Sequence, residues 1–276
     1  MELLNKPTRW RLIQSQADSG PWNMAVDESI FEASTRGDVL PTLRLYAWDP
    51  ACLSLGHAQP VTDVDEARLQ ANGWDLVRRP TGGRAILHTD ELTYSVTGPQ
   101  DEPILAGEIM SSYRRLSSAI LAAVEQIGVG VQALPQDKTN NATPEPVCFE
   151  IPSSYEITYN NKKLVGSAQA RRKGGVLQHG TLPLVGDLAR ITQVLAFPDE
   201  TSRTLAAERL LKRATTVQSA LGKTISWQQA AEAFIQAFSE VLNLDLVPGQ
   251  LTDDEISRAG QLLQEKYANP EWTRRL

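Results

Sequence analysis

Two stretches of the chain concentrate the residues whose types and spacing can carry out chemistry. The first, RRPTGGRAILH, occupies residues 78–88 and places two adjacent glycines among arginines. The second, residues 147–180, contains Cys148 and the pair Lys162–Lys163, and the two stretches together hold two of the three histidines. A cysteine thiolate is a nucleophile that forms covalent acyl intermediates, and a neighbouring cation favours the thiolate. The two stretches therefore predict one acyl-binding site built around a cysteine and a lysine.

The glycine pair Gly82–Gly83 separates two predicted strands, residues 75–79 and 85–88. The GxxxxGK[ST] spacing of a phosphate-binding loop is absent, and no predicted helix follows that would add its N-terminal dipole. Glycines have no Cβ atom, so a ligand can lie directly against this backbone. The surrounding donors suit phosphate, carboxylate or carbonyl groups: Arg78, Arg79, Arg84 and His88. A tight turn with solvated arginines explains the same residues, and the sequence does not decide between the two.

The two cysteines have different surroundings. Cys52 lies in an apolar run and is expected to be a buried small hydrophobe, which is also the alternative explanation for Cys148. Asn160–Asn161 predicts a hairpin turn that returns Lys162–Lys163 beside the chain after Cys148. Successive side chains of a strand point to opposite faces, so at most one lysine faces the site. The sequence leaves open which one, and two solvated lysines are the alternative.

Small and basic residues follow the lysine pair. Gly166, Ser167 and Ala168 leave room for a ligand beside it. His179, on the next predicted strand, is either a core histidine with satisfied hydrogen bonds or a donor behind the site. Arg171–Lys173, followed by two glycines, predicts an exposed hairpin tip, and its functional alternative is a docking patch for an acidic partner.

The composition excludes several classes of protein. The chain has 276 residues, 41% of them hydrophobic and 22% charged, as expected for a globular protein with a sizeable core. Its net charge of −6 argues against a nucleic-acid binder. No stretch approaches the roughly 18 apolar residues of a membrane helix, and the N-terminus lacks a secretory pattern, so a cytoplasmic location with free thiols is expected. No cysteine–histidine cluster has metal-ligand spacing, and no metal site is expected.

The remaining sequence supplies the elements that must position these residues. Period-two alternation predicts strands at residues 9–14, 42–48, 51–55, 92–96, 129–134, 155–159, 163–169 and 176–184. The second and third of these are expected to form a hairpin. Apolar stripes at helical spacing predict helices at residues 20–34, 62–72, 107–127, 187–195, 205–221, 227–242 and 253–267, with a short link at 244–247. Hairpins mixed with helices, without regular alternation, predict an α+β fold around a mixed β-sheet.

Three stretches resemble signatures of the lipoate–protein ligase and octanoyltransferase family. The family's glycine loop is similar to RRPTGGRAILH followed by ELTYSV, and its lysine motif is similar to KKLVGSAQARRKGGVLQHGTLPL. The cysteine segment of the octanoyltransferase branch is similar to CFEIPSSYEI. The stretches occur in the family's order. With PWNMAVDE near the N-terminus and YANPEWT near the C-terminus, the similarity spans nearly the whole chain.

The resemblance implies a mixed β-sheet flanked by helices, the class II synthetase-like fold shared with biotin protein ligases. It would place the catalytic domain at residues 38–248, with the strand and helix of residues 1–37 packed on it and a small helical element at residues 249–276. Cys148 matches the family's acyl-thioester nucleophile, and Lys163 matches the residue that lowers the pKa of that thiol. Substrate-binding residues are expected at Arg78, Thr81, Gly82, Gly83, Arg84, His88, Gly166, Ser167, Ala168 and His179.

The activity implied by the resemblance is transfer of an octanoyl group from octanoyl-acyl carrier protein to a lysine of a lipoyl domain, such as the glycine cleavage H protein. The family's ATP-dependent ligases usually carry a third glycine where this chain has Arg84, and they use no catalytic cysteine, so no cofactor is expected. The alternatives are an amidotransferase that takes octanoyl from the H protein, an ATP-dependent lipoate ligase, and a non-catalytic acyl-carrier-binding protein. The chain is expected to act as a monomer, without nucleic-acid or membrane partners.

Overall fold

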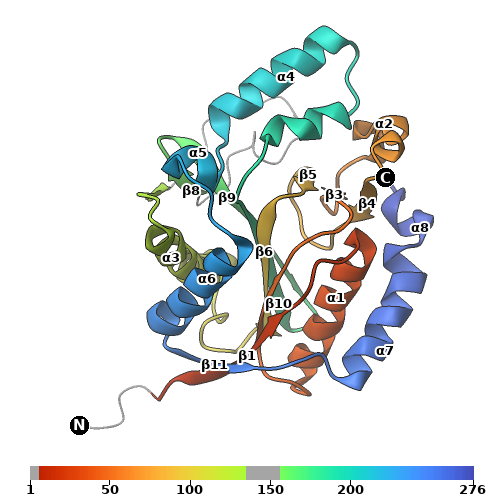
Figure 1. Cartoon of the computed structure of the whole chain (residues 1–276). Helices are drawn as coiled ribbons and strands as arrows, with labels where there is room; N and C mark the ends of the chain where they lie inside the picture. Colours follow the sequence, from red (N-terminus) through yellow and green to blue (C-terminus); the bar gives the residue numbers. More distant parts are fainter. Residues whose placement is uncertain (1–5, 135–155) are drawn as a thin grey trace.

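An eight-stranded mixed sheet forms the centre of the structure, a computed structural model that describes residues 6–134 and 156–276 (Figure 1). The strands lie in the order β11 (Leu244–Pro248), β1 (Thr8–Gln14), β2 (Thr42–Tyr46), β6 (Glu91–Pro99), β10 (Gly175–Pro183), β9 (Lys162–Arg172), β8 (Glu156–Tyr159) and β7 (Gln132–Leu134). The pairs β11–β1 and β1–β2 are parallel, and the other pairs are antiparallel. The predicted mixed sheet is confirmed.

A second sheet of three strands carries the glycine loop. Its order is β4 (Asp75–Arg78), β3 (Cys52–Leu55) and β5 (Ile86–His88). The predicted hairpin of residues 42–55 is wrong, because β2 and β3 belong to different sheets. Both edges of β2 are occupied by β1 and β6, so the chain leaves the main sheet and β3 pairs with β4 and β5.

Helices cover both faces of the main sheet (Figure 1). On one face α3 (Ile109–Ile127) packs beside α6 (Trp227–Leu242), and on the other α1 (Gly20–Arg36) packs beside α7 (Asp253–Leu262). α3 ends at Gly128, whose left-handed φ of 104° suits a glycine. α6 begins after a capping box of Ser226 and Gln229. The predicted helices at residues 107–127 and 227–242 are therefore confirmed.

The predicted helix at residues 205–221 is interrupted. It consists of α4 (Glu200–Arg213) and α5 (Val217–Leu221). The Thr215 N–H between them donates to the carbonyl of Lys163 in β9 (3.0 Å), and this tertiary bond replaces a helical one. The break therefore ties the α4–α5 segment to the start of the strand that carries the lysine pair.

Smaller elements complete the described chain. They are α2 (Glu66–Ala71), α8 (Pro270–Thr273), η1 (Val61–Asp63), η3 (Leu188–Gln193) and η4 (Leu263–Tyr267). The predicted link at residues 244–247 is the edge strand β11, which pairs with β1. Across residues 6–134 and 156–276, no helix combines the length and apolarity that crossing a membrane requires.

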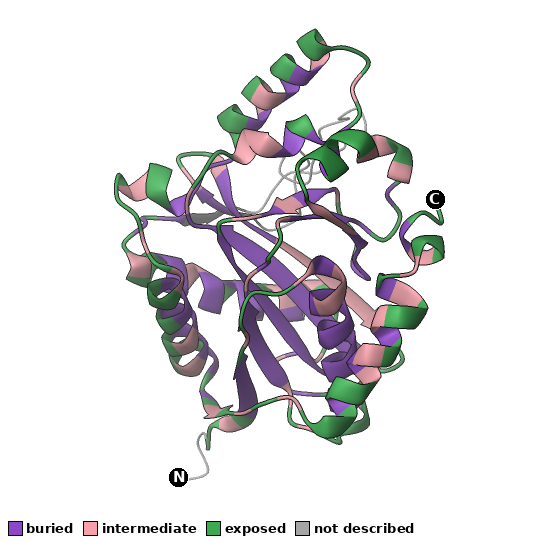
Figure 2. Ribbon diagram, turned by 45° about the vertical axis from the view of Figure 1, so that its right-hand side comes forward, coloured by how far each residue is buried: buried purple, intermediate pink, exposed green. Residues whose placement is uncertain are grey.

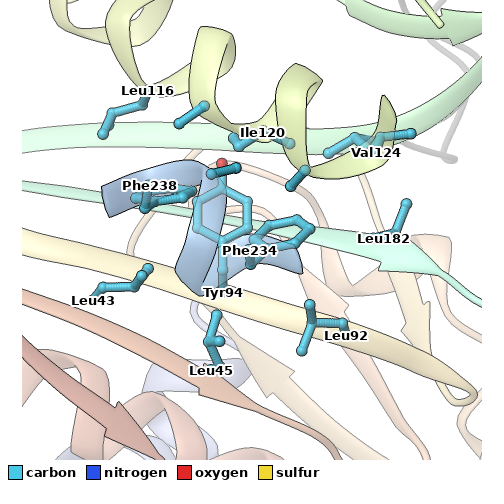
Figure 3. Packing of buried hydrophobic residues seen from close by; sticks show 14 of the residues in the cluster. Leu43, Leu45, Leu92, Tyr94, Leu116, Ile120, Val124, Leu182, Phe234 and Phe238 are labelled. Atoms are coloured by element: carbon cyan, nitrogen blue, oxygen red, sulfur yellow. The ribbon is translucent and has the colours of Figure 1, made fainter. Parts of the chain in front are cut away.

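The largest apolar cluster lies between the main sheet and the layer of α3 and α6 (Figure 3). Tyr94 of β6 packs against Phe234 and Phe238 of α6, with ring centroids 5.9 and 6.3 Å from its own. All three rings are fully buried. Figure 2 shows the same arrangement for the whole molecule, with buried strands at the centre and exposed residues on the outer faces of the helices. Burial of these rings stabilises the attachment of α6 to the sheet.

The C-terminal segment is fastened to the second sheet and to α1. The Arg78 guanidinium donates twice to the carbonyl of Thr273 (2.8 and 3.0 Å), and the indole of Trp272 donates to the Arg78 carbonyl (2.8 Å). Lys266 forms an ion pair with Glu28 of α1 (2.6 Å). Residues 249–276 therefore brace the strand that leads into the glycine loop.

Phe234→Ala should lower the free energy of unfolding by about 3–5 kcal/mol, because it leaves a cavity beside Tyr94. Chemical denaturation followed by circular dichroism measures the change. Gln236→Ala, on the exposed side of the same helix, is the matched control and should change it by less than about 0.5 kcal/mol. A loss below about 1 kcal/mol in the Phe234 variant would mean that this cluster does not hold α6 on the sheet.

Candidate active site

A cavity of about 480 Å³ is lined by residues of both sheets and of α1 and α3. Met24, Tyr46 and Thr93 line it and are buried. Ile109, at the N-terminal end of α3, also lines it and is 51% exposed. The cavity therefore extends inward from a mouth beside α3. Its volume is in the range of sites that bind small ligands.

Most of the predicted site residues line this cavity, although they come from separate segments of the chain: Gly82, Gly83, Arg84, His88, Lys163, Gly166, Ser167, Ala168 and His179. Arg78 and Thr81 do not line it. Cys148 lies outside the described residues. The glycine loop and the lysine strand thus form two walls of one cavity, as the sequence predicts.

The two lysines of β9 point in different directions. Lys163 is buried and lines the cavity. Lys162 is half-buried, and its Nζ donates to the carbonyl of Leu211 in α4 (2.7 Å). The turn at Asn160 and Asn161, with φ of 48° and 61°, closes the predicted hairpin and sets this alternation. Of the pair, Lys163 is the lysine at the site.

The small residues of β9 face a tightly packed strand. Gly180 of β10 lies opposite Ser167, and a Cβ atom there would overlap the carbonyl of Gly166 and the ring of Tyr94. Only glycine permits this close approach. The Tyr94 hydroxyl and Ser167 Oγ are hydrogen-bonded (2.7 Å). The wall of the cavity beside Lys163 is therefore held in one position.

Asp27 of α1 is a buried carboxylate that joins the helix to two strands. Arg44 Nη1 and Ser95 Oγ donate to its Oδ1, and the Tyr46 hydroxyl donates to its Oδ2, each at 2.8 Å. Burial alone raises the pKa of this carboxyl, but Arg44 and the hydrogen bonds outweigh burial and lower the net pKa below its ordinary value of 3.8. Asp27 is therefore ionised at neutral pH and forms a buried ion pair with Arg44.

His179 connects this ion pair to the glycine loop. Its Nδ1 lies 3.7 Å from Asp27 Oδ2, and its Nε2 lies 2.6 Å from the hydroxyl of Thr81. Burial lowers the pKa of His179 and outweighs the opposing effect of Asp27, so the ring is neutral at pH 7. These contacts support the core-histidine alternative. Thr81 was predicted to bind substrate, but its side chain instead anchors the loop to His179.

His88 belongs to a second buried network. Its Nδ1 lies 2.7 Å from Glu91 Oε1, and its Nε2 lies 2.7 Å from Ser54 Oγ. Burial raises the pKa of Glu91, but His88 and Thr93 outweigh burial and lower the net pKa. An ionised carboxylate requires a donor, so Nδ1 carries a proton, and Nε2 shares a hydrogen bond with the Ser54 hydroxyl. Both nitrogens are used inside the protein, and His88 presents its ring, not a donor, to the cavity.

Arg79 holds the glycine loop in place. Its Nη2 donates to the carbonyls of Gly82 (2.9 Å) and Arg84 (2.7 Å). Gly83 has a φ of 93°, and its carbonyl rests against Gly56, where any Cβ atom would overlap it. The sequence placed Arg79 among several arginines around the loop. Only the tertiary contacts identify it as the residue that fixes the loop.

Arg78 does not occupy the substrate-binding position predicted for it. Its side chain is fully buried and donates to the carbonyls of Gly56 (2.9 Å), Gln59 (2.5 Å) and Thr273 (2.8 Å). Adjacent side chains of an extended chain point to opposite sides. Arg79 therefore faces the cavity, and Arg78 faces the C-terminal segment.

The basic hairpin tip is not the free docking patch that the sequence predicts as an alternative. Arg171 donates to the carbonyl of Gly107 (2.6 Å), and Arg172 forms an ion pair with Glu28 (2.7 Å). Arg171 and Arg172 are half-buried, and Lys173 is exposed. Arg171 therefore binds the segment before α3, and Arg172 binds helix α1.

Several cavity residues carry no chemical signature and were missed as site residues: Met24, Tyr46, Trp48, Ser54, Ile86, Thr93, Ile109, Met110, Tyr113, Gln169, Gly180 and Thr181. Met24 and Met110 lie on predicted apolar helix stripes, where the spacing that marks a buried face is the same for a core and for a cavity wall. Trp48 stacks on the His88 ring (centroids 4.0 Å apart). No sequence pattern distinguishes such a residue from ordinary core.

Asp27→Asn should lower the free energy of unfolding at pH 7 by about 3–5 kcal/mol, because Arg44 is left as an uncompensated buried charge. The folded-state pKa of Asp27 is lowered, so its contribution is complete above the ordinary pKa of 3.8 and is lost as pH falls through the folded value. Denaturation between pH 7 and pH 2 should therefore show the difference between wild type and variant narrowing only below about 3.8.

Asp38→Asn is the matched control, because Asp38 is exposed and its ion pair with Arg36 lies at the surface (2.7 Å). Its effect should stay within about 0.5 kcal/mol across the whole range. A difference between wild type and Asp27→Asn that does not depend on pH would contradict the account of this ion pair.

Known proteins resemble the chain over almost its full length. Octanoyltransferase LipM of Symbiobacterium thermophilum is 40% identical over 97% of this chain and 99% of its own. The protein of the same name from Kyrpidia tusciae is 40% identical over 96% of this chain and 98% of its own. A solved bi-partite lipoate protein ligase from Thermoplasma acidophilum, described with its E2 lipoyl domain, is 28% identical, with a TM-score of 0.81 and coverage of 97% of this chain and 96% of its own.

A solved lipoate-protein ligase A bound with ATP is 27% identical, with a TM-score of 0.76 and coverage of 98% of this chain and 99% of its own. The sequence profile of the lipoyl protein ligase A/B catalytic domain matches residues 19–239. That range contains the glycine loop, Lys163 and most of the helices that pack on the main sheet. The chain therefore belongs to the lipoyl protein ligase A/B catalytic-domain family.

Proposed function

We propose that the chain transfers an octanoyl group from octanoyl-acyl carrier protein to a lysine of a lipoyl domain, such as the glycine cleavage H protein, in lipoate biosynthesis. The relatives named octanoyltransferase LipM support the acyl group and the reaction class. The T. acidophilum ligase described with its E2 lipoyl domain supports a lipoyl-domain acceptor. The observation that carries the proposal is a buried lysine, Lys163, in the wall of a cavity that opens beside α3.

The cavity suits an eight-carbon chain. Apolar side chains that line it include Met24, Trp48 and Ile86. Burial of about seven methylene-sized groups at about 0.8 kcal/mol each supplies roughly 5–6 kcal/mol of binding free energy. Residues 166–168 of β9, with side chains no larger than that of serine, lie beside the lysine and leave room for the thioester end of the chain.

In the first half-reaction, the thiolate of Cys148 attacks the thioester carbonyl of the donor. Lys163 as an ammonium group stabilises the thiolate before attack and gives a proton to the departing thiolate of the donor. A new carbon–sulfur bond to Cys148 replaces the bond to the donor. Cys52 cannot take this role, because it is fully buried and burial raises the pKa of its thiol well above the ordinary value.

In the second half-reaction, the amine of the acceptor lysine attacks the acyl-cysteine carbonyl. The amine gives its proton to Lys163, which is neutral after the first step, and Cys148 departs as the thiolate. The enzyme returns to its starting charges, with an amide formed and a thioester consumed. The thioester drives the reaction, so the mechanism uses neither ATP nor another cofactor. We place it in a reducing compartment such as the cytoplasm, where the Cys148 thiol stays free.

Wild-type protein mixed with octanoyl-acyl carrier protein, without acceptor, should gain the mass of one octanoyl group. Intact-mass spectrometry measures the adduct, and hydroxylamine should remove it because it is a thioester. Cys148→Ser should abolish the adduct or leave one that resists neutral hydroxylamine. Cys52→Ala is the matched control and should keep the adduct, since that thiol is buried away from solvent.

Three results would overturn the proposal. An adduct that persists unchanged in Cys148→Ser would place the acyl group elsewhere. Lipoylation by Cys148→Ser with free lipoate and Mg-ATP would show an ATP-dependent ligase, the activity suggested by the ATP-bound structural relative. If octanoyl-H protein loads the cysteine and octanoyl-acyl carrier protein does not, the enzyme is an amidotransferase with the same catalytic pair.

A further inference from the structure

The cationic side chains that line the cavity differ in whether they have interaction partners within the protein. Within the described residues, Arg79, Arg84 and Lys163 are the lysines and arginines that line it. Arg79 is bonded to two carbonyls of the glycine loop. Lys163 also has an interaction partner. For the side chain of Arg84 no hydrogen bond, ion pair or ring contact exists in the part of the chain that the structure describes.

Within the described part of the chain, no carboxylate lies beside the Arg84 guanidinium in the cavity wall. The described lining of the cavity contains three lysines and arginines and neither an aspartate nor a glutamate, although the chain as a whole carries a net charge of −6. Glu91, which is hydrogen-bonded to the cavity-lining His88, is buried and does not itself line the cavity. The described cavity wall therefore favours a ligand with negative charge.

Arg84 lies where an extended ligand can reach it. It is half-buried and follows Gly82 and Gly83, which are both exposed. A Cβ atom at Gly82 would meet open space. A chain-like ligand that leaves the cavity can therefore cross the glycine pair and place an anion against the guanidinium. Arg79 fixes the carbonyl of Arg84, so the position from which its side chain extends is constant (2.7 Å).

We propose that Arg84 binds the phosphodiester of the phosphopantetheine arm that carries the octanoyl group, an inference that rests on the proposed function. The acyl chain and the thioester are uncharged, and the arm that joins them to the carrier has its charge at the phosphate. A guanidinium pairs with phosphate through two parallel hydrogen bonds. A phosphate on a linear arm can follow the glycine pair into this position, whereas an acidic protein surface must meet a half-buried side chain from outside.

Small thioesters separate the arm from the carrier. The substrates are octanoyl-4′-phosphopantetheine and octanoyl-pantetheine, which differ only by the phosphate, each assayed with a saturating lipoyl-domain acceptor. Wild-type protein should use the phosphorylated thioester about tenfold better in kcat/KM, the scale of one charge-assisted pair. The ratio should decrease with added salt, because Arg84 is only half-buried and the pair is partly screened by solvent ions.

In Arg84→Gln the ratio of the two kcat/KM values should fall to about one, and Arg84→Lys should give an intermediate ratio because it keeps the charge without the fork. The ratio cancels any loss that the substitution causes with both substrates. Lys173→Gln is the matched control, because Lys173 is exposed at the far hairpin and does not line the cavity. It should leave the ratio near ten.

A wild-type ratio near one, or a ratio unchanged in Arg84→Gln, overturns the inference while the proposed function stands. A loss in Arg84→Gln that appears with octanoyl-acyl carrier protein and not in the small-substrate ratio also overturns it, and assigns Arg84 to the surface of the carrier domain. If wild-type protein transfers octanoyl from none of the three donors (the two small thioesters and the carrier protein), the proposed function is overturned and this inference with it.

Discussion

Asp27 and Arg44 meet inside the protein, where both charges are removed from water. Desolvation costs several kcal/mol for each ion, and the pair is tolerated only because its geometry and additional hydrogen bonds offset that cost. Tyr46 and Ser95 supply those bonds at 2.8 Å each. The pair can form only when α1, β2 and β6 have come together in one arrangement, so the position of α1 on the sheet is tightly specified.

The packing of α1 on the sheet also fixes the position of the glycine loop in the candidate site. His179 extends the ion pair of Asp27 to the hydroxyl of Thr81, and Arg79 holds the carbonyls on the other side of the glycine loop. Arg78, one position earlier, ties the same segment to the C-terminal residues through Thr273. The loop carries no bulky side chain at the glycine pair, and its shape is fixed by buried polar groups that surround it.

Local signals in the sequence were sufficient for much of this fold. The turn at Asn160–Asn161, the stop at Gly128 and the capping box at Ser226 each depend on a few neighbouring residues, and the elements they bound were predicted. The pairing of β2 and β3 was predicted wrongly because strand partners are chosen by distant segments. The same limit applies to charged residues, since tertiary contacts separate the role of Arg78 from that of Arg79.

The candidate site also contains some residues that could be predicted from the sequence and some that could not. The family resemblance chose Lys163 over Lys162, and the structure places Lys163 in the cavity wall and bonds Lys162 to Leu211 of α4. Met24 and Trp48 were beyond prediction as site residues, because an apolar side chain beside a cavity has the sequence pattern of an apolar side chain in a core. The position of a cavity depends on the tertiary packing of distant segments, so its apolar lining residues cannot be identified from the sequence pattern.

The pH dependence of Cys148 alkylation tests most directly whether a lysine in the cavity wall activates the cysteine. Iodoacetamide labelling with peptide mapping follows Cys148 separately from the buried Cys52. The account predicts an inflection well below the ordinary thiol pKa of about 8.5 in wild type, a shift upward in Lys163→Met, and no shift in Lys162→Met. An inflection near 8.5 in wild type, or one that Lys163→Met leaves in place, would contradict it.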